Sequence, residues 1–190
     1  MHPDPFLQSL RENLLRTPRR QIHIDGFAHA AVLVPLLQVR GELEVLLTRR
    51  TDEVDTHKGQ ISFPGGMVED SDRDPEHTAL REAEEELGLP PSFVVTVGLL
   101  DDHATPSRFV ITPVVGVLQG VPLLVPNPRE VAEVLRVPLA FFADKTKVRR
   151  EQREFLGRTH DVWFYDTGTH VIWGATAAMI RSLLHRMAML

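Results

Sequence analysis

The 190-residue chain contains no cysteine. This absence excludes disulfide bonds, thiol nucleophiles and zinc sites built on cysteine, and it fits a reducing compartment. Long hydrophobic runs are also absent: the longest apolar stretch, near residues 30–39, has about ten residues, too few to span a bilayer. Residues 1–5 provide neither the basic nor the apolar region of a secretory signal. We therefore expect a cytoplasmic protein with no membrane partner.

Positive charge is in short supply too, with 21 Lys and Arg against 26 Asp and Glu and a formal net charge of −5. Such a balance argues against a nucleic-acid partner, because nucleic-acid binders are usually basic. The hydrophobic share of 43% and the charged share of 25% are typical of a globular protein. We expect one domain over residues 1–190, with residues 1–27 as a helical extension.

The spacing of apolar residues predicts secondary structure along most of the chain. Helices are expected over residues 5–16, 75–87, 138–142 and 174–187. Strands are expected over residues 30–37, 44–48, 61–63, 93–100, 110–118, 130–137, 147–155 and 159–165. Pro64, Gly65 and Gly66 act as a breaker between two of these elements. Because strands alternate with a few helices, the pattern predicts an α/β or α+β fold with a mixed sheet.

Acidic residues concentrate in the helix expected over residues 75–87. Each helical residue advances by about 100°, so Glu82, Glu85 and Glu86 share one face. Their charges repel, and Arg81 is the one cation placed to help, four residues before Glu85. A solvated acidic face is the simpler explanation of such a run. A hard divalent cation such as Mg²⁺, which prefers oxygen ligands, is the alternative.

The glycines upstream of this helix favour the metal. Gly65 and Gly66 permit close backbone approach, so a carbonyl of this turn could reach a cation held by the helix. A glycine turn, a capped helix and clustered carboxylates seldom occur together by chance.

These residues resemble the Nudix hydrolase signature, Gly-x5-Glu-x7-Arg-Glu-U-x-Glu-Glu-x-Gly-U, in which U is a bulky aliphatic residue. Its second half is matched, with Ala83 at the first U, by Arg81, Glu82, Glu85, Glu86, Gly88 and Leu89. Its first half departs, because Asp72 stands where the signature has Glu and one additional residue precedes Arg81. We interpret this as a loop insertion in which Asp72 takes over the pairing with Arg81 that supports the helix.

A second motif is similar to the coenzyme A diphosphatase branch of the same family. That branch has Leu-Leu-Thr-x-Arg-[Ser/Ala]-x3-Arg-x3-Gly-x3-Phe-Pro-Gly-Gly, and the matching residues here are Leu46, Leu47, Thr48, Arg50, Gly59, Phe63, Pro64, Gly65 and Gly66. Thr51 and Asp55 depart from it, and Asp55 reverses the charge of the motif arginine. The likeness covers residues 28–187 and implies an α/β/α sandwich around a central mixed sheet.

The resemblance implies metal-dependent hydrolysis of the diphosphate bond of coenzyme A, or of a derivative, to 3′,5′-ADP and 4′-phosphopantetheine. The implied cofactor is Mg²⁺ or Mn²⁺. Its implied ligands are Glu82, Glu85 and Glu86, with the backbone carbonyl of Gly65. Arg81 joins the catalytic set. Glu82, Glu130 and Glu133 are the candidates for the general base.

Several further residues are candidates for substrate contact, and arginines among them suit phosphate because the guanidinium fork matches its oxygens. A surface position without a substrate role is the simpler explanation for each single arginine. Trp173 could stack on a base, but we expect it to pack in the core. The candidates are Arg49, Arg50, His57, Lys58, Gly59, Phe63, Gly65, Gly66 and Arg108.

Two other functions remain open. The substrate could be another nucleoside diphosphate derivative, such as ADP-ribose, NADH or a dinucleoside polyphosphate. Asp55 is the reason for this alternative, because it departs from the coenzyme A motif. A non-catalytic Nudix-like binding module is the other, which the three retained glutamates disfavour. A homodimer is also left open.

Overall fold

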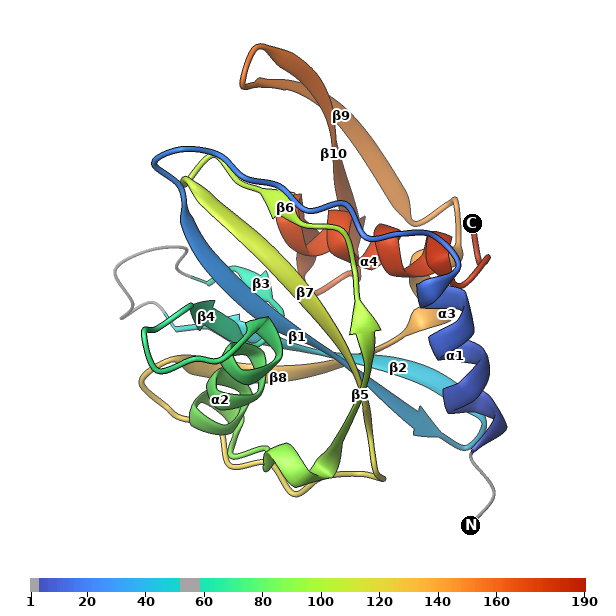
Figure 1. Ribbon diagram of the computed structural model, residues 1–190. Coiled ribbons are helices and arrows are strands. Elements are labelled where there is room, and N and C mark those ends of the chain that lie inside the picture. Colours follow the sequence, from blue (N-terminus) through green and yellow to red (C-terminus); the bar gives the residue numbers. More distant parts are fainter. Residues whose placement is uncertain (1–3, 52–58) are drawn as a thin grey trace.

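The computed structural model describes residues 4–51 and 59–190. Figure 1 shows helices on both sides of a large sheet and a second, smaller sheet that extends from one end. The helices are α1 (Pro5–Leu15), α2 (Pro75–Leu87), a single 3-10 turn η1 (Pro91–Phe93), α3 (Leu139–Ala143) and α4 (Gly174–Arg186). The strands are β1 (Ala28–Val39), β2 (Glu42–Arg50), β3 (Ile61–Ser62), β4 (Gly65–Met67), β5 (Val94–Leu99), β6 (His103–Ala104), β7 (Phe109–Leu118), β8 (Val131–Pro138), β9 (Val148–Phe155), β10 (Arg158–Asp166) and β11 (Val171–Trp173).

The large sheet is built around β1. Its order is β3-β2-β1-β7-β5, with β4 paired to β1, β6 to β7 and β8 to β2. Strands β1 and β7 run parallel, whereas β2 and β4 pair with β1 in the antiparallel sense. A strand with a parallel neighbour is usually covered on both faces, which explains the unbroken apolar run in β1. The mixed sheet expected from the sequence is confirmed.

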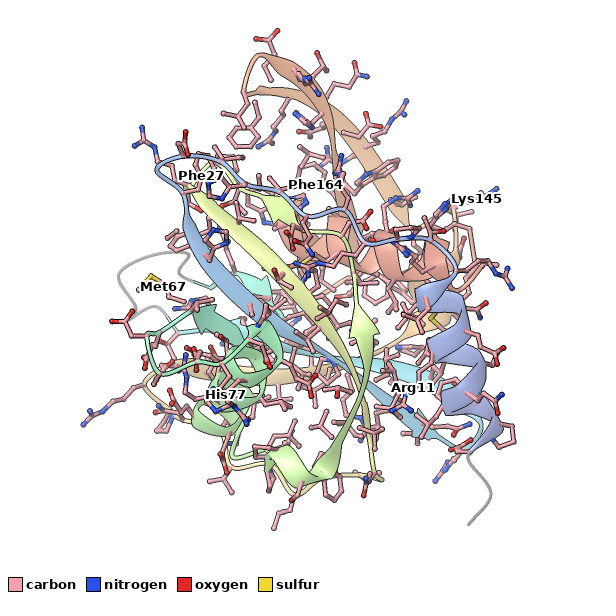
Figure 2. All side chains as sticks on the ribbon, viewed as in Figure 1. Arg11, Phe27, Met67, His77, Lys145 and Phe164 are labelled. Atoms are coloured by element: carbon pink, nitrogen blue, oxygen red, sulfur yellow. The ribbon has the colours of Figure 1, made fainter. Side chains whose placement is uncertain are left out.

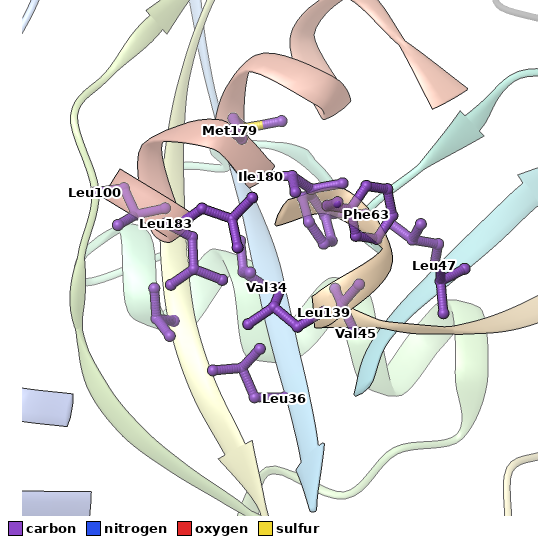
Figure 3. Packing of buried hydrophobic residues seen from close by; sticks show 14 of the residues in the cluster. Val34, Leu36, Val45, Leu47, Phe63, Leu100, Leu139, Met179, Ile180 and Leu183 are labelled. Atoms are coloured by element: carbon purple, nitrogen blue, oxygen red, sulfur yellow. The ribbon is translucent and has the colours of Figure 1, made fainter. Parts of the chain in front are cut away.

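The two faces of β1 carry separate hydrophobic clusters, because successive side chains of a strand point to opposite sides. Ala31 and Leu33 pack with the apolar side of α2. Val34 and Leu36 pack on the other side, with Ile180 and Leu183 of α4, as Figure 3 shows. The chain therefore forms the expected α/β/α sandwich.

Two local expectations were wrong. Gly65 and Gly66 do not only break a strand: with Met67 they form β4, which pairs with Ala30, Ala31 and Val32 of β1. Trp173 does not pack in the core; it is 37% exposed and stacks on Phe164 with ring centroids 5.7 Å apart. It lies in β11 of the small sheet, whose order is β11-β10-β9.

Helix α1 is tied to the rest of the molecule through its last turns. Leu10 and Leu14 are buried in the cluster that also holds the α4 side chains. Arg186 of α4 donates to the carbonyl of Leu14 at 2.9 Å and to the carboxylate of Asp101 at 2.6 Å. The extension thus shares its core with the sheet. Within the described residues, no helix is long and apolar enough to cross a membrane.

Substitution of Leu14 tests this shared core. Leu14→Ala should lower the free energy of unfolding by about 2–4 kcal/mol, because it leaves a cavity under a fully packed side chain. Leu15→Ala is the matched control, since Leu15 is 75% exposed and its loss should cost no more than about 0.5 kcal/mol. Urea unfolding measures both. Equal effects of the two substitutions would show that α1 does not belong to the core.

Candidate active site

Helix α2 holds the predicted glutamates in a fixed orientation. It begins as the sequence predicts, with the Asp74 carboxylate accepting from the His77 N–H at 2.8 Å, and it ends at Gly88 in the left-handed conformation, φ 63°. Ala79, Ala83 and Leu87 are fully buried against the sheet. Since this apolar side sets the rotation of the helix, the acidic side faces β4 and the edge of the sheet.

The three glutamates of α2 share a side of the helix but not an environment. Glu86 is buried, with only 3% of the residue exposed. The Glu82 side chain is 15% exposed, whereas that of Glu85 is 57% exposed. Glu82 and Glu86 thus form the interior of the cluster, and Glu85 lies at its solvent edge.

Arg81 connects the glutamates to the loop before the helix. Its guanidinium donates two bonds to Asp72, at 3.1 and 3.0 Å, and one to Glu82 at 2.9 Å. The Asp72 side chain is buried and also accepts from Thr78 and from the Glu69 N–H. The Arg81 bonds, outweighing burial, hold the pKa of Asp72 well below its usual range. The pairing expected from the loop insertion is present.

The glycines of β4 lie directly against the glutamates. A Cβ on Gly66 would come within 2.4 Å of the Glu82 carboxylate, and one on Gly65 would come within 2.4 Å of the Ala31 carbonyl. The Gly65 N–H donates to Glu86. Met67 and His77, labelled in Figure 2, mark the strand and the helix that enclose this contact. Glycine is therefore required at position 65, where a Cβ would meet the backbone of β1, whereas a Cβ at position 66 would displace the Glu82 carboxylate.

Burial dominates the electrostatics of Glu86. It raises the pKa of Glu86 to about 8, and the negative charges of Glu82 and Glu130 add to this. Arg50 opposes the shift only in part, because its Nη1 is 4.0 Å from the carboxylate. Burial also raises the pKa of Glu82, against the bond from Arg81. A site that opposes the charge on its own carboxylates gains by binding a cation.

Glu130 joins this cluster, and Glu133 does not. Glu130 raises the pKa of both Glu82 and Glu86. Glu133 is held elsewhere, by Arg49 at 3.3 Å and by His170 at 3.2 Å. Of the two distant candidates for the base, Glu130 is therefore the one whose charge acts on Glu82 and Glu86.

Asn127 was missed by the sequence reasoning, although it lies next to the site. Its N–H donates to the carbonyl of Glu86 at 2.8 Å, and its side-chain amide donates to Glu130 at 2.9 Å. It thereby fixes Glu130 to the end of α2. Its position between Pro126 and Pro128 marks a turn, which was the available signal.

The carboxylates fit a hard divalent cation through their chemistry, with all-oxygen donors and too few cations to balance them. Within residues 4–51 and 59–190, no three His, Asp or Glu side chains already form a ready ligand set. Mg²⁺ typically uses one or two protein carboxylates and completes its shell with water and substrate phosphate. Glu82 and Glu86 are the two best placed.

A chamber of about 980 Å³ adjoins the glycine strand. Gly65, Gly66 and Arg50 line it near the carboxylates, and Phe63 supplies part of its apolar wall. The apolar lining also includes Ile22, Phe109, Ile111, Phe155 and Met179.

The other residues predicted to contact substrate do not lie together. Arg49 is engaged with Glu133, and Arg108 lies outside the chamber, in a smaller hollow beside Phe27. Gly59 forms a turn at φ 64° before β3. His57 and Lys58, like Asp55, lie outside the described residues. Of the predicted arginines, Arg50 and Arg81 are therefore the ones beside the carboxylates.

Comparisons with known proteins agree with this geometry. A family model described as the NUDIX domain matches residues 27–159. "Nudix hydrolase 15, mitochondrial" of Arabidopsis thaliana is 39% identical over 158 residues, which cover 80% of this chain and 55% of that protein. The chain thus spans about half the length of this relative.

"Uncharacterized Nudix hydrolase NudL" of Photorhabdus laumondii is 38% identical over 159 residues, 84% of each chain. Among solved structures, a Nudix hydrolase from M. smegmatis, RenU, has a TM-score of 0.60 at 21% identity, covering 88% of this chain and 97% of that one. At 21% identity, the similarity to the RenU structure shows the fold alone.

Removal of the Asp72 charge tests whether the ion pair between Asp72 and Arg81 stabilises the site. Asp72→Asn should lower the free energy of unfolding by about 3 kcal/mol, because Arg81 keeps a buried charge without its partner. Asp70→Asn, at an exposed position of the same loop, should change it by less than about 0.5 kcal/mol. Thermal or urea unfolding at neutral pH distinguishes them, and a loss below about 1 kcal/mol for Asp72→Asn would contradict the role of the pair.

The raised pKa of Glu86 predicts that ionisation of this residue destabilises the folded, chelator-treated protein as pH rises. The folded protein favours the protonated form of Glu86. The resulting contribution to the free energy of unfolding is fully present below the unfolded pKa of 4.5 and is lost as pH rises towards about 8. Compared with wild type, Glu86→Gln should therefore become progressively more stable between pH 5 and pH 8. Glu84→Gln, on the exposed side of α2, should show no such trend in thermal unfolding. A pH-independent difference for Glu86→Gln would contradict the burial effect.

Proposed function

The chain belongs to the Nudix hydrolase family, and on this premise we propose that it hydrolyses the diphosphate bond of coenzyme A or a derivative. The observation that carries the proposal is the pair of Glu82, partly buried, and Glu86, buried, against a glycine strand that also lines a chamber of about 980 Å³. The products are 3′,5′-ADP and 4′-phosphopantetheine.

Glu82 and Glu86 would hold the cofactor, with Glu85 at the solvent edge and the Gly65 carbonyl as a further donor. Bound Mg²⁺ or Mn²⁺ supplies charge neutralisation, polarisation of the diphosphate and a lowered pKa of the attacking water. Arg81 keeps Glu82 oriented by its bond of 2.9 Å. These residues bring an anionic substrate to a site that would otherwise repel it.

Glu130 is the proposed acceptor of the proton from water. Asn127 donates to its Oε1 at 2.9 Å, which orients the carboxylate. Arg50 is the proposed phosphate contact, because its Nε is buried with no hydrogen-bond partner among the described residues and its Nη1 lies beside Glu86. A bound phosphate oxygen would satisfy this donor.

The chamber supports coenzyme A over a substrate with two nucleosides. Its apolar lining suits a long and mostly apolar substituent better than a second sugar and base. The motif from Leu46 to Gly66 supports the same choice. Hydrolysis of ADP-ribose, NADH or a dinucleoside polyphosphate is the second candidate. A purely binding role is disfavoured, because a binding module gains nothing from burying Glu86.

A substrate panel tests the proposal. The pure protein with Mg²⁺ or Mn²⁺ should hydrolyse coenzyme A with a higher kcat/KM than ADP-ribose, NADH or diadenosine tetraphosphate, with products identified by chromatography. Glu86→Gln should lose at least about 100-fold in kcat, roughly 2.7 kcal/mol of barrier, and Glu84→Gln should retain the wild-type rate. No turnover of any diphosphate would overturn the hydrolase, and a preference for ADP-ribose would overturn coenzyme A alone.

A further inference from the structure

The ribbon of β9 and β10 contributes a wall of the chamber. It projects from the body of the molecule in Figure 1 and pairs with the register Arg153↔His160 and Phe155↔Arg158. Cross-strand partners lie on the same side of a ribbon, and neighbours along a strand alternate. These four residues therefore share one face, and all four line the chamber.

Most arginines of this ribbon already have partners. Arg153 pairs with Glu151 at 2.9 Å and lies over the Phe164 ring. Arg150, on the opposite face, pairs with Asp161 at 3.3 Å. Arg158 differs, because no carboxylate within the described residues forms an ion pair with it.

Three acids also line the chamber, Asp102, Glu154 and Asp161. Glu154 pairs in register with Thr159, which places both on the face opposite to Arg158. Asp102 is occupied by Arg19 and by the Thr112 hydroxyl. Asp161 is paired with Arg150, and within the described residues none of these three acids forms an ion pair with Arg158.

A second arginine reaches the same chamber from a distant part of the chain. Arg20, which precedes β1, lines it together with His103 and His160. Burial lowers the pKa of His103 to about 4, and the positive charges of His160 and Arg20 contribute to this. Arg20, His103 and His160 are therefore near enough for their charges to interact.

We propose that Arg158 and Arg20 form a second anion subsite, which binds a phosphate of the substrate other than the diphosphate that is cleaved. The proposal rests on the proposed function, in which this group is the 3′-phosphate of coenzyme A. Two guanidinium groups match phosphate oxygens in charge and geometry. The subsite would select substrates that carry the additional phosphate, since its loss leaves both arginines without an acceptor.

A comparison of coenzyme A with dephospho-coenzyme A tests the subsite, because the two differ only in the 3′-phosphate. Wild type should prefer coenzyme A in kcat/KM. Arg158→Gln should lower kcat/KM for coenzyme A by about 10- to 100-fold and leave that for dephospho-coenzyme A within about twofold. Arg150→Gln, on the opposite face of the same ribbon, should change neither.

A binding measurement separates failure of the subsite from failure of the proposed function. In calorimetry, wild type should bind adenosine 3′,5′-bisphosphate more tightly than AMP, and Arg158→Gln should abolish this difference. If coenzyme A is not hydrolysed, the proposed function fails, and this binding preference still decides the subsite. The subsite is overturned by equal affinity of wild type for the two nucleotides, or by equal losses of Arg158→Gln on both coenzyme A substrates.

Discussion

The ion pair between Arg81 and Asp72 is the contact on which the rest of the site depends. The Asp72 side chain is buried and binds the loop through the Glu69 N–H and the helix through Thr78. Arg81 extends the network to the Met67 carbonyl of β4, at 3.1 Å, and to Glu82. One guanidinium thus joins loop, strand and helix, which keeps β4 against the carboxylates. Despite its short side chain, the aspartate accepts two hydrogen bonds from the arginine, at 3.1 and 3.0 Å.

Elements with strong local signals were predictable. Helix α2 begins after Asp74 and ends before Gly88 as expected, because both ends are set by capping residues that act within a few positions. Strand β1 was recognised from its apolar run, although it extends beyond residues 30–37 at both ends. The glycine pair was understood only in part, since its pairing with β1 depends on contacts that adjacent residues do not reveal.

The environments of the glutamates could not be predicted from helical spacing alone. That spacing places Glu85 and Glu86 on one face, yet the first is largely exposed and the second is buried. The difference arises from β4 and from the segment at Asn127, which cover only one edge of the acidic face. The same distant contacts bring Glu130 to the cluster and keep Glu133 away. Net charge is therefore a poor guide here, because a few desolvated acids matter more than the total.

The parallel pairing of β1 with β7 has a consequence for the order of events during synthesis. Ala28 pairs with Phe109, so the two halves of the central ladder are separated by roughly eighty residues of chain. Such a non-local contact closes slowly, and a nascent chain leaves the ribosome with the apolar strand β1 before its parallel partner exists. The hairpin with β2 is available at once and covers only one edge. The interval before β7 emerges is therefore when this chain is most exposed to aggregation and most in need of a chaperone.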